Sequence, residues 1–252
     1  MHQIDSTPMT PEFFEAWHAA ASHLDSQGDG HLSWLRADPN PPLLEHLSFR
    51  MGNQIFFIRV VDADGRVEGP ASEDGYRQLA EQADGHAFEM PMRRCLDGSW
   101  SPVLPDWGLR DPATGAPINP VALLSAERIP MSLFERHAFA VQVVRDYLSE
   151  QGFTVDSWVS HPEVDPAIFF EGASGSPEWV VVRHAAFPHR EAPRPDNLTN
   201  IVAAVASYSR KGHFASVAIV STQQRFDSTD EPAAPLIRGE GMHVRFTGLE
   251  PL

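Results

Sequence analysis

Two segments of the chain place apolar residues three or four positions apart, as on one face of an amphipathic helix. These residues are Phe13, Trp17, Ala20 and Leu24 in the first segment, and Phe134, Ala138, Val141, Val144 and Leu148 in the second. Thr10 followed by Pro11 is typical of a helix start, and Ser132 with Glu135 three residues later forms a capping box. Gly152 predicts the end of the second helix.

Runs of β-branched and aromatic residues predict strands after each helix. The expected strands lie near residues 31–35, 46–51, 54–61 and 86–92, and then near 153–160, 167–170, 179–187, 213–221 and 242–246. Shorter helices are expected over 72–83 and after Asp196, where Leu198, Ile201, Val202, Val205 and Tyr208 form an apolar stripe that Gly212 closes. Short connections favour antiparallel pairing. Residues 179–182 are apolar on both faces, which predicts a strand inside the sheet.

The two halves of the chain resemble each other, with residues 13–92 matching residues 133–220. The matched pairs include Trp34 with Trp158, Ile55 with Trp179, Arg59 with Arg183 and His86 with His213. Each copy has the predicted order α-β-β-β-α-β. We therefore expect an α+β protein of two tandem units with mainly antiparallel sheets, residues 1–120 and 121–252. A proline-rich arm or linker over residues 96–120 belongs to the first unit, and its Trp100 and Trp107 are expected to dock on the body of that unit.

Composition narrows the function classes. The net charge is −15, with only nineteen Lys and Arg side chains, which argues against a nucleic-acid surface and favours a basic protein partner. A single cysteine, Cys95, permits no intramolecular disulfide and fits a reducing compartment. The chain shows neither a membrane-spanning apolar run nor a secretory signal, so we expect a cytoplasmic protein with no membrane partner.

The leading interpretation has no catalytic residue and treats three carboxylates as ordinary turn and cap residues, but an alternative makes them catalytic. The element order resembles the core of restriction-endonuclease-like nucleases, in which an acidic residue on the first helix, an Asp on the second strand and a Glu-x-Lys on the third hold magnesium. Glu135, Asp165 and Glu178 occupy comparable places. Val180 stands where that family has its lysine, and the only lysine of the chain, Lys211, lies far along the sequence. A metal-dependent nuclease, or a catalytically inactive descendant of one, is therefore the alternative interpretation.

Arg59 and Arg183 are the candidate binding residues, because both lie at the end of the most apolar strand of their copy. They either neutralise a carboxylate at the sheet edge or line a paired surface. Over residues 13–92 and 134–246 the topology also resembles the bacterial type III secretion chaperones. That resemblance implies a non-enzymatic dimer that binds partly unfolded segments of client proteins, and a duplicated chain would be an internal pseudo-dimer. A homodimer is the other expectation, and we expect no cofactor or metal. The leading prediction is a cytoplasmic protein-binding or chaperone-like protein, of a secretion-accessory or immunity type.

Overall fold

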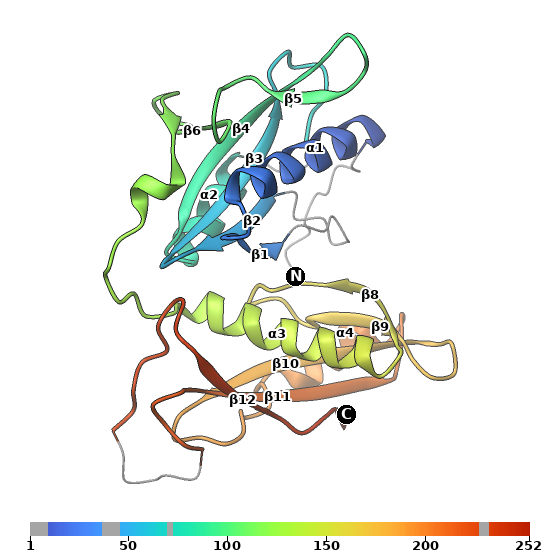
Figure 1. Cartoon of the computed structure of the whole chain (residues 1–252). Coiled ribbons are helices and arrows are strands. Elements are labelled where there is room, and N and C mark those ends of the chain that lie inside the picture. The colour runs from blue at the N-terminus through green and yellow to red at the C-terminus, as the bar shows by residue number, and fades with distance from the viewer. Residues whose placement is uncertain (1–9, 37–45, 70–72, 227–231) are drawn as a thin grey trace. The chain divides into compact units, whose positions relative to one another are not determined.

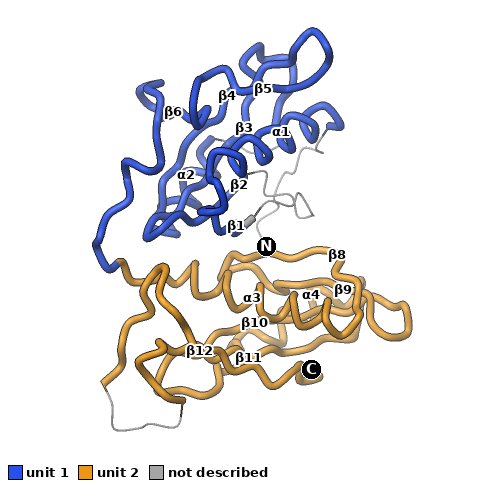
Figure 2. The backbone as a smooth tube through the Cα atoms, viewed as in Figure 1, with its two compact units in different colours: residues 1–39, 43–128 blue, residues 40–42, 129–252 orange. Residues whose placement is uncertain are grey.

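The computed structural model in Figure 1 describes residues 10–36, 46–69, 73–226 and 232–252. The described residues divide into two compact units, one ending at Arg128 and the other beginning at Ile129 (Figure 2). The expected boundary lay earlier, between residues 120 and 121. Each unit combines helices with a mixed sheet, so the expected α+β class is confirmed. Within the described residues, no helix is both long and apolar enough to cross a membrane.

The first unit contains one seven-stranded sheet. Its helices are α1 (Pro11–Gly28), α2 (Glu73–Gln82) and the short 3-10 helix η1 (Pro120–Leu123). Its strands are β1 (Ser33–Arg36), β2 (His46–Met51), β3 (Gln54–Asp62), β4 (His86–Arg94), β5 (Trp100–Pro102), β6 (Leu109–Arg110) and β7 (Pro117–Ile118). The strand order is β1-β2-β3-β4-β6-β7, with β5 also beside β4. Among the described strands of this unit, β3 and β4 are the one parallel pair.

The second unit contains one six-stranded sheet. Its helices are α3 (Leu133–Glu150) and α4 (Leu198–Val205), and its strands are β8 (Thr154–Trp158), β9 (Ile168–Glu171), β10 (Pro177–Ala186), β11 (Gly212–Ser221), β12 (Met242–Phe246) and β13 (Glu250–Pro251). The strand order is β12-β11-β10-β9-β8, with β13 beside β11. Within the described part of this unit, β10 and β11 are the sole parallel pair. Both units thus have the expected element order, while the duplication itself stays a prediction.

Helix α1 forms as its sequence predicts. The Oγ1 atom of Thr10 accepts a hydrogen bond of 3.2 Å from the backbone N–H of Phe13, and Pro11 is the first helical residue. The predicted apolar face is buried over its whole length, at Phe13, Trp17, Ala20 and Leu24. This face joins the core on one side of the sheet with alternate residues of β3, such as Phe56 and Ile58. Helix α2 lies against the same central strands from the other side (Figure 1). Ser72, its expected first residue, lies outside the described residues.

The proline-rich segment is part of the first sheet, which is why the unit extends past residue 120. Strands β5 and β6 both pair with β4, and Trp100 and Trp107 are buried, as expected of docked side chains. The prolines and glycines of this segment shorten its strands to two or three residues each, because proline cannot donate to the ladder. The segment is therefore an extension of the sheet and not a linker.

Helix α3 confirms the predicted capping box and corrects the predicted face. The side chains of Val141, Val144 and Leu148 are buried, but Phe134 is only half-buried. Glu135 and His137 are buried in its place. Arg238 neutralises the carboxylate of Glu135 inside the unit, whereas Nε2 of His137 has no hydrogen-bond partner among the described residues.

Helix α4 is shorter than its apolar stripe predicts. It ends at Val205, which is half-buried, and both Val202 and Tyr208 are exposed. Its N-cap is Asn197 and not Asp196, and Gly212 begins β11 where a helix end was expected. Strand β10 is covered on both faces as predicted: Val180 and Val182 pack with α3, while Trp179 and Val181 pack with Ile201 of α4.

The difference between the two ends of α3 predicts different costs of truncation. Leu148→Ala removes a fully buried side chain and should lower the free energy of unfolding by about 2–5 kcal/mol. Phe134→Ala should cost roughly 1–2 kcal/mol, because part of that ring is already in water. Urea midpoints of the two variants of the full chain measure this. Equal midpoints would show that the buried face of α3 is wrongly assigned.

Candidate functional site

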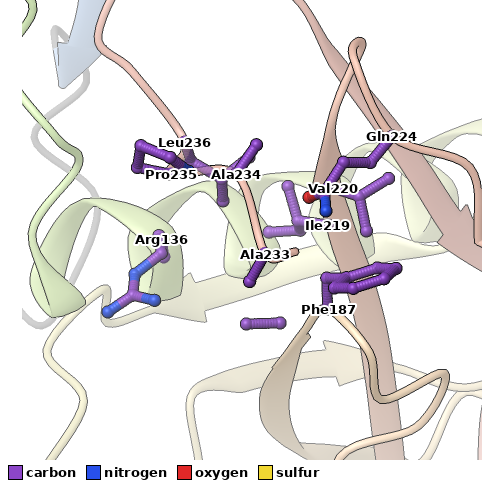
Figure 3. A pocket seen from close by; sticks show the side chains of 10 residues that line it. Arg136, Phe187, Ile219, Val220, Gln224, Ala233, Ala234, Pro235 and Leu236 are labelled. Atoms are coloured by element: carbon purple, nitrogen blue, oxygen red, sulfur yellow. The ribbon is translucent and has the colours of Figure 1, made fainter. Parts of the chain in front are cut away.

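A pocket of about 270 Å³ lies at the carboxyl ends of the parallel strands β10 and β11. In sheets with parallel strands and crossover helices, ligands commonly bind at these ends. The lining residues are Arg136, Ala186, Phe187, Ile219, Val220, Gln224, Ala233, Ala234, Pro235 and Leu236. Figure 3 shows them on four structural elements: the first turn of α3, the end of β10, the end of β11 and the segment 233–236. Eight of the ten are apolar, so the pocket favours an apolar ligand group.

The segment 233–236 is held in place from both ends. The carbonyl of Leu236 accepts a hydrogen bond of 2.8 Å from Met131, and Ile237 forms an isolated antiparallel bridge with Pro130. At the other end, Nε2 of Gln224 donates to the carbonyl of Pro232 over 2.9 Å. The chain segment that precedes α3 and the turn that follows β11 therefore fix one wall of the pocket.

A buried ion pair anchors the start of α3 below this wall. Nε and Nη2 of Arg238 donate to the two carboxylate oxygens of Glu135 over 2.9 and 2.8 Å, and both side chains are at most 7% exposed. The same carboxylate accepts the backbone N–H of Ser132 over 2.8 Å, which completes the capping box. Removal of either partner would leave an unpaired buried charge, which is costly. The ion pair therefore holds the start of α3 against the segment that follows Leu236. Glu135 is therefore a structural residue.

Two polar groups that line the pocket have unused hydrogen-bonding capacity. The guanidinium of Arg136 has one hydrogen bond to the described residues, from Nε to the carbonyl of Ser132 over 3.3 Å, and no described carboxylate lies within ion-pair distance of it. Gln224 is 3% exposed, and its Oε1 has no hydrogen-bond partner among the described residues. A buried acceptor without a partner is costly, so a ligand that donates to Gln224 would stabilise the site.

Two histidines near the pocket are held in the neutral form. His137 follows Arg136 on α3 and is 2% exposed, and burial together with the nearby Arg183 lowers its pKa to about 4. Burial and the guanidinium of Arg136 likewise lower the pKa of His184, on β10, to about 4. Strongly shifted pKa values beside a pocket are typical of functional sites. Of these three side chains, Arg136 alone carries a positive charge at neutral pH, because both imidazoles are neutral.

Asp165 and Arg183 pair with each other. Nη1 and Nη2 of Arg183 donate to the Asp165 carboxylate over 2.8 and 2.5 Å, and Asp165 is nearly buried. In the first unit, Arg59 donates to Glu89 over 3.1 Å, and the same carboxylate accepts two hydrogen bonds from Arg110. Both candidate binding arginines are thus engaged with a carboxylate of their own unit.

Glu178 belongs to a separate cluster at the amino end of β10. It accepts from Nε2 of His213 over 2.7 Å and lies 3.4 Å from Nζ of Lys211, which also donates to Ser174 and Ser176. The proximity of Lys211 to Glu178 is not evident from the sequence, because the lysine comes from the segment that leads into β11. The first unit has a neutral counterpart, since His86 and Gln54 lie 2.9 Å apart at the same place.

The three candidate carboxylates do not converge. Glu178 and Arg183, the partner of Asp165, are five residues apart on β10, which at ~3.3 Å per strand residue separates them by about 16 Å. Glu135 is engaged with Arg238. Among the described residues, no group of three or more His, Cys, Asp or Glu side chains is placed to hold a metal ion. The geometry expected of a magnesium site is therefore missing from the described part of the chain.

The pocket itself was not foreseen from the sequence. Arg136 and Gln224 belong to no motif, and the apolar residues of segment 233–236 lie outside any periodic pattern. The sequence feature that points toward the pocket is the buried strand at 179–182. A strand that is apolar on both faces indicates parallel pairing, and ligands commonly bind at the carboxyl ends of parallel strands.

The neutral histidine makes stability depend on pH. The pKa of His137 is about 4 in the folded chain and 6.5 when exposed, so the unfolded chain binds more protons between these values, and stability falls as pH falls from 6.5 toward 4. Between pH 7 and pH 5 one such histidine costs about 2 kcal/mol. Urea unfolding at both pH values should show a smaller loss in His137→Leu than in the unchanged chain. The exposed His189→Gln is the control, and a loss as large in His137→Leu would contradict the assignment.

Comparison with known proteins gives one match. No curated protein and no solved structure matches the chain. Residues 134–252, which span α3 to β13 and contain every described residue that lines the pocket, match the model of a domain of unknown function (DUF8840). The part of the chain that carries the candidate site is thus similar to that domain.

Proposed function

We propose that this chain is a non-enzymatic, cytoplasmic protein-binding protein of a chaperone-like kind. The observation that carries the proposal is the composition of the pocket. Its described lining residues include no Ser, Thr, Cys, Asp, Glu, His, Lys or Tyr, and so no side chain that serves as a nucleophile or general base. What the lining offers instead is apolar surface, one guanidinium and one amide. These groups bind a ligand without transforming it.

The engagement of the candidate catalytic groups supports the same proposal. Glu135, Asp165 and Glu178 each contact a different cationic side chain or histidine. A carboxylate that already neutralises a buried arginine has little capacity left for a metal ion, because both of its oxygens accept hydrogen bonds. We therefore interpret these carboxylates as structural, and the nuclease alternative loses the residues on which it rested.

The charge distribution favours a protein partner with basic surface. Residues 1–128 carry nineteen acidic and nine basic side chains, whereas residues 129–252 carry fifteen and ten. Most of the net negative charge therefore belongs to the first unit, and the apolar pocket belongs to the second. A client protein with a basic region and a partly unfolded apolar segment would bind both the acidic first unit and the apolar pocket of the second. A secretion-accessory or immunity role would need such a client. Because the chain resembles dimeric chaperones, we also propose that it forms a homodimer.

Affinity purification of the full chain from its native cells, with chemical cross-linking and mass spectrometry, tests the proposal. We expect a protein recovered in stoichiometric amount, with cross-links to the chain, and no nucleic acid. Recovery of nucleic acid without a protein partner would contradict the proposal and favour the nuclease alternative. Light scattering of the purified chain measures whether it forms the proposed homodimer.

The absence of nuclease activity is a separate prediction. Cleavage of phosphodiesters needs carboxylates that hold a cation together with a group that positions water, and Asp165 lies at the opposite end of β10 from Glu178 and Lys211. Linear DNA, supercoiled DNA and RNA should all stay intact with magnesium or manganese. Cleavage that disappears in Asp165→Ala and Glu178→Ala would refute the binding function. Cleavage that persists in both variants would point to a contaminant.

A further inference from the structure

We propose that the pocket of the second unit binds a peptide segment in which a bulky apolar residue is flanked by an acidic residue. The apolar side chain fills the pocket, the acidic side chain pairs with Arg136, and a backbone N–H donates to Gln224. This inference rests on the proposed protein-binding function and names the kind of segment that the partner presents. The volume, the charge and the hydrogen-bonding groups of the pocket each support a peptide ligand of this kind.

The size of the pocket suits one side chain. At about 270 Å³ it is smaller than the range of about 300–1,000 Å³ typical of small-molecule sites. Phe187, Ile219 and Leu236 give it walls of large apolar side chains, and alanines leave the space between them. A pocket of this kind takes a single anchor residue of a partner, the arrangement that dominates the energetics of many protein interfaces.

The positive charge of Arg136 determines which type of partner residue lies beside the apolar anchor residue. Arg183 and Arg238 of the same unit are each paired with a carboxylate, whereas Arg136 has no described carboxylate within ion-pair distance. The hydrogen bond from its Nε to Ser132 fixes the side chain against the start of α3, which leaves the terminal nitrogens to donate. A carboxylate is the group that a guanidinium binds with two parallel hydrogen bonds. An acidic residue next to the anchor would supply it.

The free acceptor of Gln224 distinguishes a peptide from other apolar anions. Its Nε2 is used by Pro232, which holds the amide in one orientation, and its Oε1 is buried without a described partner. Figure 3 shows Gln224 beside Val220 on the wall of the pocket. A ligand with a hydrogen-bond donor would satisfy this oxygen. A peptide has such a donor in every backbone N–H, whereas an apolar carboxylic acid, ionised at neutral pH, has none.

Nuclear magnetic resonance on the ¹⁵N-labelled full chain tests this inference. The probe is acetyl-Ser-Glu-Phe-Glu-Ser-amide, in which a carboxylate flanks the apolar residue on either side. Control peptides replace both Glu residues by Gln, or Phe by Gly, and 4-phenylbutyrate supplies an apolar group and a carboxylate without a peptide N–H. We expect the probe to shift the amide signals of Ile219, Val220 and Leu236 and to bind at least tenfold more tightly than each of the three controls.

Variants of the chain assign each contact. Arg136→Gln should weaken binding of the probe about tenfold, to the level of the Gln-containing peptide, and should leave binding of that control peptide unchanged. Gln224→Leu should weaken binding of every peptide more than binding of 4-phenylbutyrate, because it removes the acceptor for the peptide N–H as well as the hydrogen bond that holds Pro232. Ala234→Phe fills the pocket and should abolish binding. The matched control is Arg145→Gln on the same helix, whose arginine pairs with Asp146 at the surface. Thermal unfolding of each variant confirms that it is folded before binding is measured.

Several outcomes would overturn the inference while the proposed function stands. Absence of probe shifts at the pocket, or undiminished probe binding by Arg136→Gln, would do so even if cross-linking recovers a protein partner. Equal affinity for 4-phenylbutyrate and the probe would indicate that the ligand is a small carboxylic acid and not a peptide. Conversely, probe binding at the pocket without any recoverable protein partner would support the site and contradict the wider function.

Discussion

The parallel pairing of two strands at the centre of each sheet determines the rest of the structure. Strands β3 and β10 are apolar on both faces, and burying such a strand requires cover on each side. Parallel pairing with the next strand requires a crossover, which α2 and α4 provide on one face, while α1 and α3 cover the other. Both units satisfy this constraint with the same order of elements.

Because the middle of each central strand is apolar, polar groups gather where these strands begin and end. At the amino ends, His86 meets Gln54 and His213 meets Glu178. Farther along β3, Arg59 pairs with Glu89 of the adjacent strand, whereas Arg183 on β10 pairs with Asp165 of a loop. The position of the arginine is shared by the two units, but its carboxylate partner comes from a different place in each. Pairing is thus the common requirement, and the source of the partner varies.

In the second unit, two polar groups that line the pocket lack such a partner among the described residues. Arg136 lies beside neutral histidines and has no described carboxylate partner, and Gln224 keeps an acceptor without a described donor. Groups that a fold leaves unsatisfied are costly unless a ligand satisfies them. The engaged carboxylates and the open pocket therefore support the same proposal, that the second unit binds an apolar, acidic segment of a partner.

Local patterns in the sequence determined the elements. The cap and the face of α1, the capping box of α3, the strands and the doubly covered β10 follow from residue spacing and side-chain shape, which act over a few neighbouring residues. Tertiary structure decided which side chains meet. It buried His137 in place of Phe134, brought Lys211 to Glu178 and set Arg136 opposite Gln224 across a pocket. Spacing along the chain carries no information on such contacts, because they join residues that are far apart in sequence and close only after the sheet has formed.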